Sequence, residues 1–375
     1  MDCYTFPELS VDEWGQTLLE KLRWGRYPLG GMFELTNRCN LSCVHCYINE
    51  PSKCQTAREK ELTTAEIKHI LDQLVDAGCL FLVFTGGEPL IRNDFPEIFQ
   101  YARGKGIIVS LFTNGTMVTP QIADMLAEWR VQSIEVTLYG ASQDTYDQVT
   151  RVPGAFRNVQ RGIGLMLERG LPLSLKSVLL TINLHELHAM QEYAKDLGVN
   201  FHYDGMLFPR IDGSRAPLNY QISMDDLLQF DIEDAQRQKE WKRLADKYKE
   251  TALRSSYVYH CGAGLRTFHI DSEGMLSMCT MARQPAYDLR KQNFSEAWNK
   301  LGDSRRKERK LHTPCETCEI RAICMQCPAW SQAVHGDDET PVEFICKLSH
   351  LRANVLENTF IMNNEEIINY EQKNL

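Results

Sequence analysis

Cysteines are the most unusual feature of this 375-residue sequence, which contains thirteen of them. Three stand close together near the N-terminus, and seven are concentrated in the last third of the chain. A chain of this size that shows no export signal does not need disulfide bonds for stability. The spacing of the cysteines therefore indicates sites for metal binding or redox chemistry.

The N-terminal set, Cys39, Cys43 and Cys46, has the spacing Cys-x3-Cys-x2-Cys. Three thiolates at this spacing fit three corners of a [4Fe–4S] cube, which leaves the fourth iron open to another ligand. A zinc site with a distant fourth ligand, or three buried cysteines, are the alternatives. The motif follows an expected strand, and sites in parallel α/β proteins lie at the carboxyl ends of strands. This position favours a functional metal site.

The next expected strand ends in the sequence Thr-Gly-Gly-Glu-Pro at positions 85–89. Two glycines allow a ligand to approach the backbone closely, and the carboxylate of Glu88 can pair with an ammonium group. Taken alone, the segment is equally consistent with an ordinary turn between a strand and a helix. Together with the cysteine motif one strand earlier, it indicates a binding site.

Both motifs lie in a region, residues 31–206, where short apolar runs alternate with helical patterns. Near-continuous apolar strands between helices are typical of a parallel sheet covered by helices. About six β/α units are expected, and periodicity alone allows either an open doubly wound sheet or a partial barrel. The expected strands are 32–36, 80–85, 107–113, 133–139, 173–179 and 200–206.

Beyond residue 206 the pattern changes. A long polar stretch at 223–253 predicts a single solvated linker helix, and 267–281 predicts a hairpin. The expected divisions are an N-terminal extension (1–28), an α/β domain (29–222), a helical linker (223–254), a small cysteine-rich α+β domain (255–350) and a tail (351–375).

Composition excludes several classes of protein. The net charge of −9 does not suit general binding to a nucleic acid backbone. The longest apolar run is far shorter than the ~20 residues of a membrane span. The N-terminus lacks the charged and then apolar pattern of a signal peptide. We therefore expect a cytoplasmic protein without nucleic acid or membrane partners.

The two motifs together resemble those of the radical S-adenosylmethionine (radical SAM) enzymes. The resemblance implies a partial (β/α)6 TIM-type barrel over about 31–206. It also implies that Cys39, Cys43 and Cys46 hold a catalytic [4Fe–4S] cluster, whose open iron is chelated by the methionine part of SAM. In this family one electron from the cluster cleaves SAM, and the resulting 5′-deoxyadenosyl radical abstracts hydrogen from the substrate.

The resemblance also implies which residues contact SAM. Residues 86–89 match the segment that receives the methionine amino group, and His45 and Tyr47 flank the last cysteine, near the adenine. The other matches lie at strand ends or loops, where barrel packing or a surface charge is the alternative interpretation. The residues expected near SAM are His45, Tyr47, Gly86, Gly87, Glu88, Pro89, Asn114, Thr137, Arg151 and Lys176.

The C-terminal cysteines resemble the SPASM domain, which holds two auxiliary iron–sulfur clusters, expected to be [4Fe–4S]. On spacing alone, one or two structural zinc ions are the alternative. The chain departs from the usual pattern in having two residues, not three, between Cys324 and Cys327. No eighth cysteine is evident, so the inner cluster has an open iron or a non-cysteine ligand. The inner set is Cys261, Cys279 and Cys327; the outer set is Cys315, Cys318, Cys324 and Cys346.

This resemblance implies an enzyme that modifies a ribosomally made peptide by cross-linking, epimerisation or backbone excision of the splicease type. Residues 139–154 resemble the peptide-maturase branch. The alternatives are an anaerobic sulfatase-type maturase, an enzyme that modifies a small molecule, and a non-enzymatic zinc-binding scaffold. The expected partners are a precursor peptide, an electron donor such as flavodoxin or ferredoxin, and a separate leader-recognition protein. The last is expected because about thirty residues before the first strand are too few for an independent core.

Several other residues were considered as site candidates. The charged residues after the last barrel strand are interpreted as a hydrated loop in preference to a substrate contact: Asp204, Arg210, Asp212 and Arg215. Packing or surface positions are expected for His185, His188 and His202. No metal role is expected for Cys3, Cys54 and Cys79, and Cys79 is expected to be buried as a small apolar residue.

Overall fold

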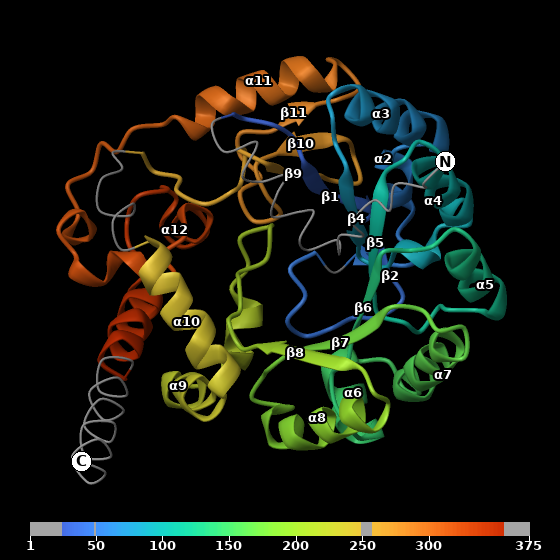
Figure 1. Cartoon of the computed structure of the whole chain (residues 1–375), viewed down its shortest axis with the longest axis horizontal. Helices are drawn as coiled ribbons and strands as arrows, with labels where there is room; N and C mark the ends of the chain where they lie inside the picture. Colours follow the sequence, from blue (N-terminus) through green and yellow to red (C-terminus); the bar gives the residue numbers. More distant parts are fainter. Residues whose placement is uncertain (1–24, 49, 249–256, 356–375) are drawn as a thin grey trace, which may run out of the picture.

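The computed structural model describes residues 25–48, 50–248 and 257–355 (Figure 1). Cys3, most of the predicted N-terminal extension and most of the predicted tail lie outside the described residues. Six parallel strands follow one another in the order β1-β4-β5-β6-β7-β8. They are β1 (Gly30–Thr36), β4 (Phe81–Gly86), β5 (Ile108–Thr113), β6 (Ser133–Thr137), β7 (Leu173–Val178) and β8 (Asn200–Asp204). The expected partial barrel of six β/α units is confirmed.

Helices cover the outer face of these strands (Figure 1). They are α3 (Thr64–Asp76), α4 (Phe95–Gly104), α5 (Pro120–Glu128), α6 (Gln143–Thr150), α7 (Ala155–Leu167) and α8 (Leu187–Asp196). Shorter elements lie between the first two strands: β2 (Arg38–Cys39), β3 (Glu50–Pro51) and α2 (Gln55–Lys60). Helix α3 begins with a capping box, since Thr63 accepts from the Glu66 amide while the Glu66 carboxylate accepts from the Thr63 amide. This reciprocal pair fixes where α3 begins.

The two faces of the barrel strands differ in chemistry. Apolar residues such as Phe33, Phe84 and Val136 are fully buried against the helices. The alternate positions face the barrel interior, as expected from the two-residue period of a strand. There, polar side chains such as Glu135 and Lys176 are about one third exposed, at 31% and 29%. The barrel therefore combines an apolar outer core with a partly polar lumen.

The prediction of a single solvated linker helix is wrong. The segment forms two helices, α9 (Met224–Glu233) and α10 (Ala235–Tyr248), because Asp234 between them has an extended backbone. The indole of Trp241 on α10 donates to the Asp231 carboxylate at 3.2 Å. Arg352, from the helix that includes residues 343–355, also pairs with Asp231 and lies over the Trp241 ring. The segment is thus packed against the cysteine-rich region.

The predicted hairpin is confirmed, but it also extends the barrel sheet, which the sequence analysis did not anticipate. Strand β9 (Thr267–Ile270) pairs antiparallel with β10 (Met275–Ser277) and parallel with β1. With β11 (Tyr287–Asp288) at the edge, the sheet has nine strands. Above it lies α11 (Phe294–Arg305), whose first amide donates to Gln73 of α3 at 2.7 Å (Figure 1). The predicted domain boundary near residue 255 stays a prediction.

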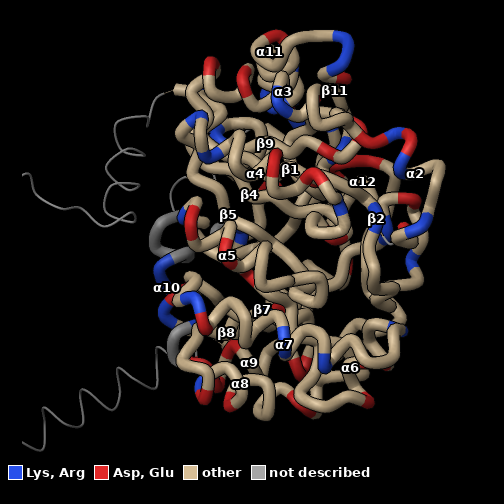
Figure 2. The backbone as a smooth tube through the Cα atoms, turned by 90° about the vertical axis from the view of Figure 1, so that its right-hand side faces the viewer, with Lys and Arg blue, Asp and Glu red and all other residues tan. Residues whose placement is uncertain are grey.

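The rest of the cysteine-rich region consists of short elements beside α9 and α10 (Figure 1). These are the 3-10 turns η4 (Pro314–Glu316) and η5 (Glu319–Ala322), helix α12 (Pro328–His335) and the helix that includes 343–355. Figure 2 shows Lys and Arg mixed with Asp and Glu over all parts of the molecule. Within the described residues, no helix is both long and apolar enough to cross a membrane.

Candidate active site

The three N-terminal cysteines lie in a loop that crosses the carboxyl end of the first barrel strand. Cys39 ends β2, and the loop after it is fixed by backbone hydrogen bonds to the last turn of α6. The Ser42 amide donates to the Thr150 carbonyl at 2.9 Å, and the Val44 amide to the Val149 carbonyl at 3.0 Å. The loop conformation is therefore held by main-chain contacts that do not depend on the thiols.

The three thiols are close enough to affect one another's ionisation. Burial, followed by the Glu88 carboxylate, raises the pKa of Cys39 to about 12. Burial also raises the pKa of Cys43 far above its usual value, and the Cys46 and Cys39 thiolates add to this effect. Such thiols ionise readily only beside a strong cationic centre. The donor set therefore fits an iron–sulfur cluster, in which each thiolate would bind a different iron.

No three His, Cys, Asp or Glu side chains among residues 25–48, 50–248 and 257–355 converge closely enough to hold a single metal ion. In this structure the cysteines of each set are neighbours, but three of their thiols do not converge on a single point. That each set holds a metal or a cluster stays a prediction.

The glycines of the 85–89 segment have a packing role. A Cβ atom at Gly86 would lie 2.2 Å from the carbonyl oxygen of Thr36, and Gly86 has a φ of +139°. A Cβ atom at Gly87 would lie 2.3 Å from the carbonyl oxygen of Arg38. Only glycine therefore allows the end of β4 to pack against the segment that leads into the cysteine loop.

Glu88 is fully buried and connects the ends of two strands. Its carboxylate accepts from the Leu90 amide (3.0 Å), the Thr113 hydroxyl (2.8 Å) and the Asn114 amide (2.7 Å). Burial raises its pKa to about 7, against the opposing effect of these hydrogen bonds. The Glu88 amide donates to the carbonyl of Arg38, the residue before Cys39, at 2.9 Å, so Glu88 lies beside the cysteine loop. Its pairing with the amino group of SAM stays a prediction.

Asn114 lies at the end of β5 and contacts the cysteine loop directly. Its side-chain amide donates to Asn40 at 2.9 Å and lies 3.6 Å from the Cys39 sulfur. Asn40 in turn donates to the Thr116 hydroxyl at 2.8 Å. Whether or not Asn114 contacts SAM, this network positions the first cysteine.

The two residues that flank Cys46 have different surroundings. The His45 ring lies 5.2 Å from the ring of Tyr139, and its buried Nδ1 has no hydrogen-bond partner among the described residues. Burial lowers the pKa of His45 to about 4, so the ring is neutral near pH 7. An unsatisfied ring nitrogen beside the cysteine loop fits a polar ligand such as SAM. The Tyr47 hydroxyl instead donates to the Glu34 carboxylate at 3.1 Å.

The remaining predicted SAM contacts lie on β6, on β7 and at the end of α6. Thr137 and Lys176 are register partners on β6 and β7. The Lys176 ammonium lies 2.9 Å from the Glu135 carboxylate and 3.4 Å from the centre of the Phe112 ring. Arg151 ends α6 with a left-handed backbone and lies 3.4 Å from the Tyr220 hydroxyl. Lys176 is therefore a lumen residue, and its contact with SAM stays a prediction, like those of Thr137 and Arg151.

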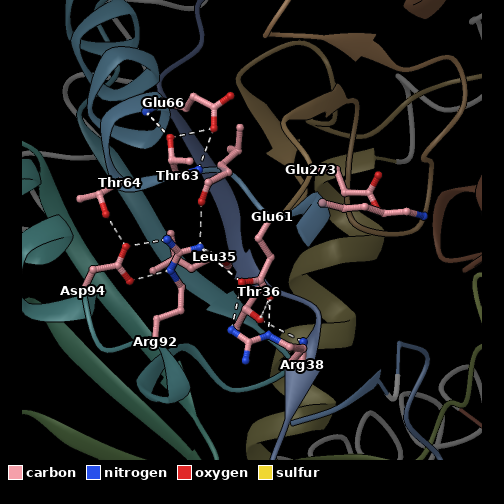
Figure 3. A network of polar contacts seen from close by, with 12 residues as sticks. Leu35, Thr36, Arg38, Glu61, Thr63, Thr64, Glu66, Arg92, Asp94 and Glu273 are labelled. Atoms are coloured by element: carbon pink, nitrogen blue, oxygen red, sulfur yellow. Dashed lines mark hydrogen bonds and ion pairs between the residues drawn. The ribbon is translucent and has the colours of Figure 1, made fainter. Parts of the chain in front are cut away.

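A buried ionic network supports the base of the cysteine loop (Figure 3). The Glu61 carboxylate accepts from Arg38, the residue before Cys39, at 2.8 and 3.0 Å, and also from the Thr36 hydroxyl. Arg92 lies 3.7 Å from Glu61 and forms a bidentate pair with Asp94 at 2.9 and 2.7 Å. The network joins the end of β1, the cysteine loop and the segment after β4.

Electrostatic interactions divide the C-terminal cysteines into two groups. Burial raises the pKa of both Cys279 and Cys327, and the thiolate of Cys261 adds to this effect at both. Burial likewise raises the pKa of Cys324 and Cys346, with a contribution from Cys315 and Cys318. These neighbours match the predicted inner and outer sets, except that Cys327 also lines a cavity together with all four cysteines of the outer set. Which set Cys327 belongs to stays a prediction. His350 lies 4.0 Å from Cys318, beside the outer set.

A cavity of about 390 Å³ lies between the barrel mouth and the inner cysteine set. The loop after β8 forms one wall and packs on α12, since the rings of Phe208 and Trp330 are 5.4 Å apart. Of the four charged residues considered after the last strand, Arg210 and Asp212 line this cavity; Asp204 and Arg215 do not. Further lining residues are Tyr259, Met281, Ala282, Arg283, Ala329 and Gln332.

The other residues weighed from the sequence lie outside the site. Cys79 is buried and Cys54 lies at the start of α2. The three histidines considered above, His185, His188 and His202, are exposed.

Sequence analysis missed the ionic group around Glu34. Glu34 on β1 is fully buried, and Arg283 forms a bidentate pair with it at 2.7 and 3.0 Å. Burial alone would raise the pKa of Glu34, but His269 and Arg283 lower it to about 2. A single carboxylate within the apolar strand 30–36 was the signal that could have identified this residue. Nothing in the sequence pairs it with residues more than 200 positions away.

Comparison with known proteins identifies the family. The model of the radical SAM superfamily matches residues 33–194. The AdoMet-dependent heme synthase of Methanosarcina barkeri is 30% identical over 325 residues, which cover 81% of this chain and 92% of that protein. The PqqA peptide cyclase of Bradyrhizobium diazoefficiens is 27% identical over 344 residues, 88% of each chain.

Two solved structures share the fold. Streptococcus suis SuiB bound to S-adenosylmethionine has a TM-score of 0.64 at 16% identity, over 92% of this chain and 83% of that one. The protein anSMEcpe with bound AdoMet has a TM-score of 0.62 at 16% identity, over 88% of this chain and 100% of that one. The chain therefore belongs to the radical SAM superfamily, among SPASM-type relatives, and is a radical SAM enzyme.

Proposed function

We propose that this radical SAM enzyme abstracts hydrogen from a ribosomally made peptide and so forms a cross-link, an epimer or a backbone excision. The observation that carries the proposal is the cavity between the barrel mouth and the inner cysteines. Its walls combine apolar side chains (Phe208, Met281), an amide (Gln332) and charged groups (Arg210, Asp212). Such a mixture suits a polypeptide, which presents backbone amides and varied side chains together. The relation to a peptide cyclase along 88% of both chains supports the same class of substrate.

We assign the following roles in this reaction to residues of the chain. Cys39, Cys43 and Cys46 would hold the [4Fe–4S] cluster, and Glu88 and His45 would bind polar groups of SAM. When bound, the cluster and SAM supply the 5′-deoxyadenosyl radical that is typical of the family. The buried positions of Cys43 and Glu88 would limit the access of water to this chemistry. Asn114 orients the loop by its contact with Cys39.

The inner cysteine set adjoins the proposed substrate cavity. Ala282 lines the cavity, and its amide donates to the Cys279 sulfur at 3.2 Å. Ala329, two residues after Cys327, lines it as well. We propose that the inner set holds an auxiliary cluster that accepts an electron from the substrate or binds a substrate thiol. The outer set would hold the second auxiliary cluster.

The experiment combines metal analysis with a comparison of substrates. Anaerobically reconstituted enzyme would be reduced and incubated with SAM, together with short peptides encoded beside its gene or with an iron porphyrin. The proposal expects iron–sulfur clusters, formation of 5′-deoxyadenosine and a mass change in one peptide. Stoichiometric zinc without iron would contradict an enzymatic role and support a zinc scaffold. A peptide that stays unmodified while the porphyrin is converted would contradict the peptide proposal.

A second candidate, heme synthesis, is favoured by the 30% identity over 92% of the M. barkeri heme synthase. In that case the substrate is a tetrapyrrole and the porphyrin arm of the same experiment gives heme. A sulfatase-type maturase would instead modify a peptide from a sulfatase, and another small-molecule substrate would leave both arms without product.

We also propose three partners: the precursor peptide, a separate leader-recognition protein and a flavodoxin or ferredoxin. SuiB has been crystallised with its precursor peptide SuiA. Titration of the purified enzyme with the full-length peptide, with and without the candidate leader-binding protein, tests the second partner. Tight binding and full turnover by this chain alone would contradict it.

A further inference from the structure

Glu34 on β1 contacts two other segments, the cysteine loop 13 residues later and the region of the inner cysteine set more than 200 residues later. Its side chain is fully buried in the barrel interior. It accepts from the Tyr47 hydroxyl at 3.1 Å and from both terminal nitrogens of Arg283 at 2.7 and 3.0 Å. The Nε2 atom of His269 lies 3.3 Å away. A carboxylate so enclosed is costly to bury unless all of these groups stay in place.

One of these partners belongs to the catalytic cysteine loop. Tyr47 directly follows Cys46, and its carbonyl oxygen accepts from the Ile211 amide of the barrel-mouth loop at 3.1 Å. Its ring also lies beside the Arg283 guanidinium, 5.8 Å from the ring centre. The position of Tyr47 therefore constrains the backbone immediately after the third thiol.

The other two partners belong to the segment of the inner cysteine set. His269 lies on β9 and its Nδ1 is 3.0 Å from the Ser277 hydroxyl of β10. Arg283 follows Ala282, whose amide contacts Cys279, and its Nε donates to the Thr280 carbonyl at 2.9 Å. The guanidinium thus fixes the turn that carries Cys279.

The backbone arrangement makes this connection direct. Because β9 pairs with β1, Met32 is the register partner of His269 and Phe33 that of Ile270. The hairpin of the inner set and the strand that carries Glu34 are therefore neighbours in one sheet. The sheet fixes the two backbones, and the Glu34 group fixes the two loops that emerge from it.

We propose that Glu34 is a positioning residue that holds the catalytic cysteine loop and the inner cysteine loop in one fixed relative geometry, through Tyr47 on one side and Arg283 on the other. The proposal rests on the radical SAM family and on metal in both sets, but not on the identity of the substrate. Buried ionic groups of this kind specify geometry more than they add stability. Loss of the group is expected to loosen both loops at once.

The test compares three variants by hydrogen exchange of the iron-free protein. Glu34→Gln keeps the shape of the side chain but removes the charge, and it should raise exchange at least about tenfold in both 42–48 and 279–284. Tyr47→Phe should raise hydrogen exchange only in 42–48, and Arg283→Gln should raise it only in 279–284. Glu135→Gln removes a lumen carboxylate that is about one third exposed and serves as the matched control, with no change in either segment.

The reconstituted protein provides a second measurement that needs no substrate. In Glu34→Gln, the paramagnetic resonance spectra of both the SAM-bound catalytic cluster and the inner cluster should change, at unchanged iron content. Changes confined to one cluster, or exchange that rises in only one segment, would overturn the proposal. If Glu34→Gln fails to fold, the double variant Tyr47→Phe/Arg283→Gln must reproduce both effects, and their absence there would also overturn it. Each outcome is independent of whether the substrate is a peptide or a tetrapyrrole.

Discussion

The catalytic cysteine loop and the outer cysteine set are built in different ways. The catalytic loop crosses the end of a parallel sheet, and its backbone is hydrogen-bonded to the last turn of α6. Within this loop, Cys43 is only 6% exposed. Three cysteines of the outer set lie on η4, η5 and short connections, whose backbone hydrogen bonds are local, such as that from the Ile323 amide to the Ile320 carbonyl, and only Cys346 lies on a longer helix. The fold therefore prearranges the first set, whereas the second depends more on what its thiols bind.

The largest effect is expected at the catalytic set. Cys43→Ala should reduce reductive SAM cleavage at least about a thousandfold, because it removes the thiolate expected at one corner of the cluster. Release of 5′-deoxyadenosine measures it. The matched control is Cys79→Ala, a second buried cysteine outside all three sets, which should keep cleavage near the normal rate. Normal cleavage in the Cys43 variant would contradict the assignment of this loop.

Removal of iron is expected to affect the two regions unequally. Anaerobic chelation should increase hydrogen exchange at 310–350 by at least about tenfold, because local order there depends on the metal. The barrel strands, which are held by the sheet and its apolar core, should change little. Equal loss of protection in both regions would show that the barrel also depends on its cluster.

The network beneath the catalytic loop should make a smaller but clear contribution. Glu61→Gln leaves the buried Arg38 without its counter-ion, which typically costs about 3 kcal/mol or more of unfolding free energy. Denaturant unfolding of the iron-free protein measures it. The control is Glu97→Gln, which removes the more exposed pair with Lys68 and should cost less than about 1 kcal/mol. If Glu61→Gln and Glu97→Gln lowered the unfolding free energy equally, the network would have no special role in stability.

Sequence predicted local features well and long-range features poorly. The strands and the motif positions follow from periodicity and spacing, which are properties of neighbouring residues. The break of the linker is local too, since the Asp234 carboxylate accepts from the Arg237 amide at 3.1 Å and so caps the start of α10. The pairing of β9 with β1 depends on tertiary contacts. The same holds for Glu34, whose partners His269 and Arg283 are distant in sequence. Contacts of that kind have no periodic pattern in one sequence.

The smallest expected effect concerns the link between the hairpin and the barrel. A Cβ atom at Gly31 would lie 2.3 Å from the ring of Phe268 on β9, so Gly31→Ala forces this contact apart. Overpacking of this kind typically costs about 1–3 kcal/mol, which denaturant unfolding would detect.

The matched control, Gly164→Ala, lies in α7, where a Cβ meets nothing within 4 Å. It should stabilise the protein by about 0.5–1 kcal/mol, because alanine favours a helix over glycine. If Gly31→Ala lowers the unfolding free energy while Gly164→Ala raises it, the hairpin is packed tightly on the barrel. If Gly31→Ala were neutral, the contact between β9 and β1 would be loose, and the inner cysteine set would be free to move relative to the catalytic one.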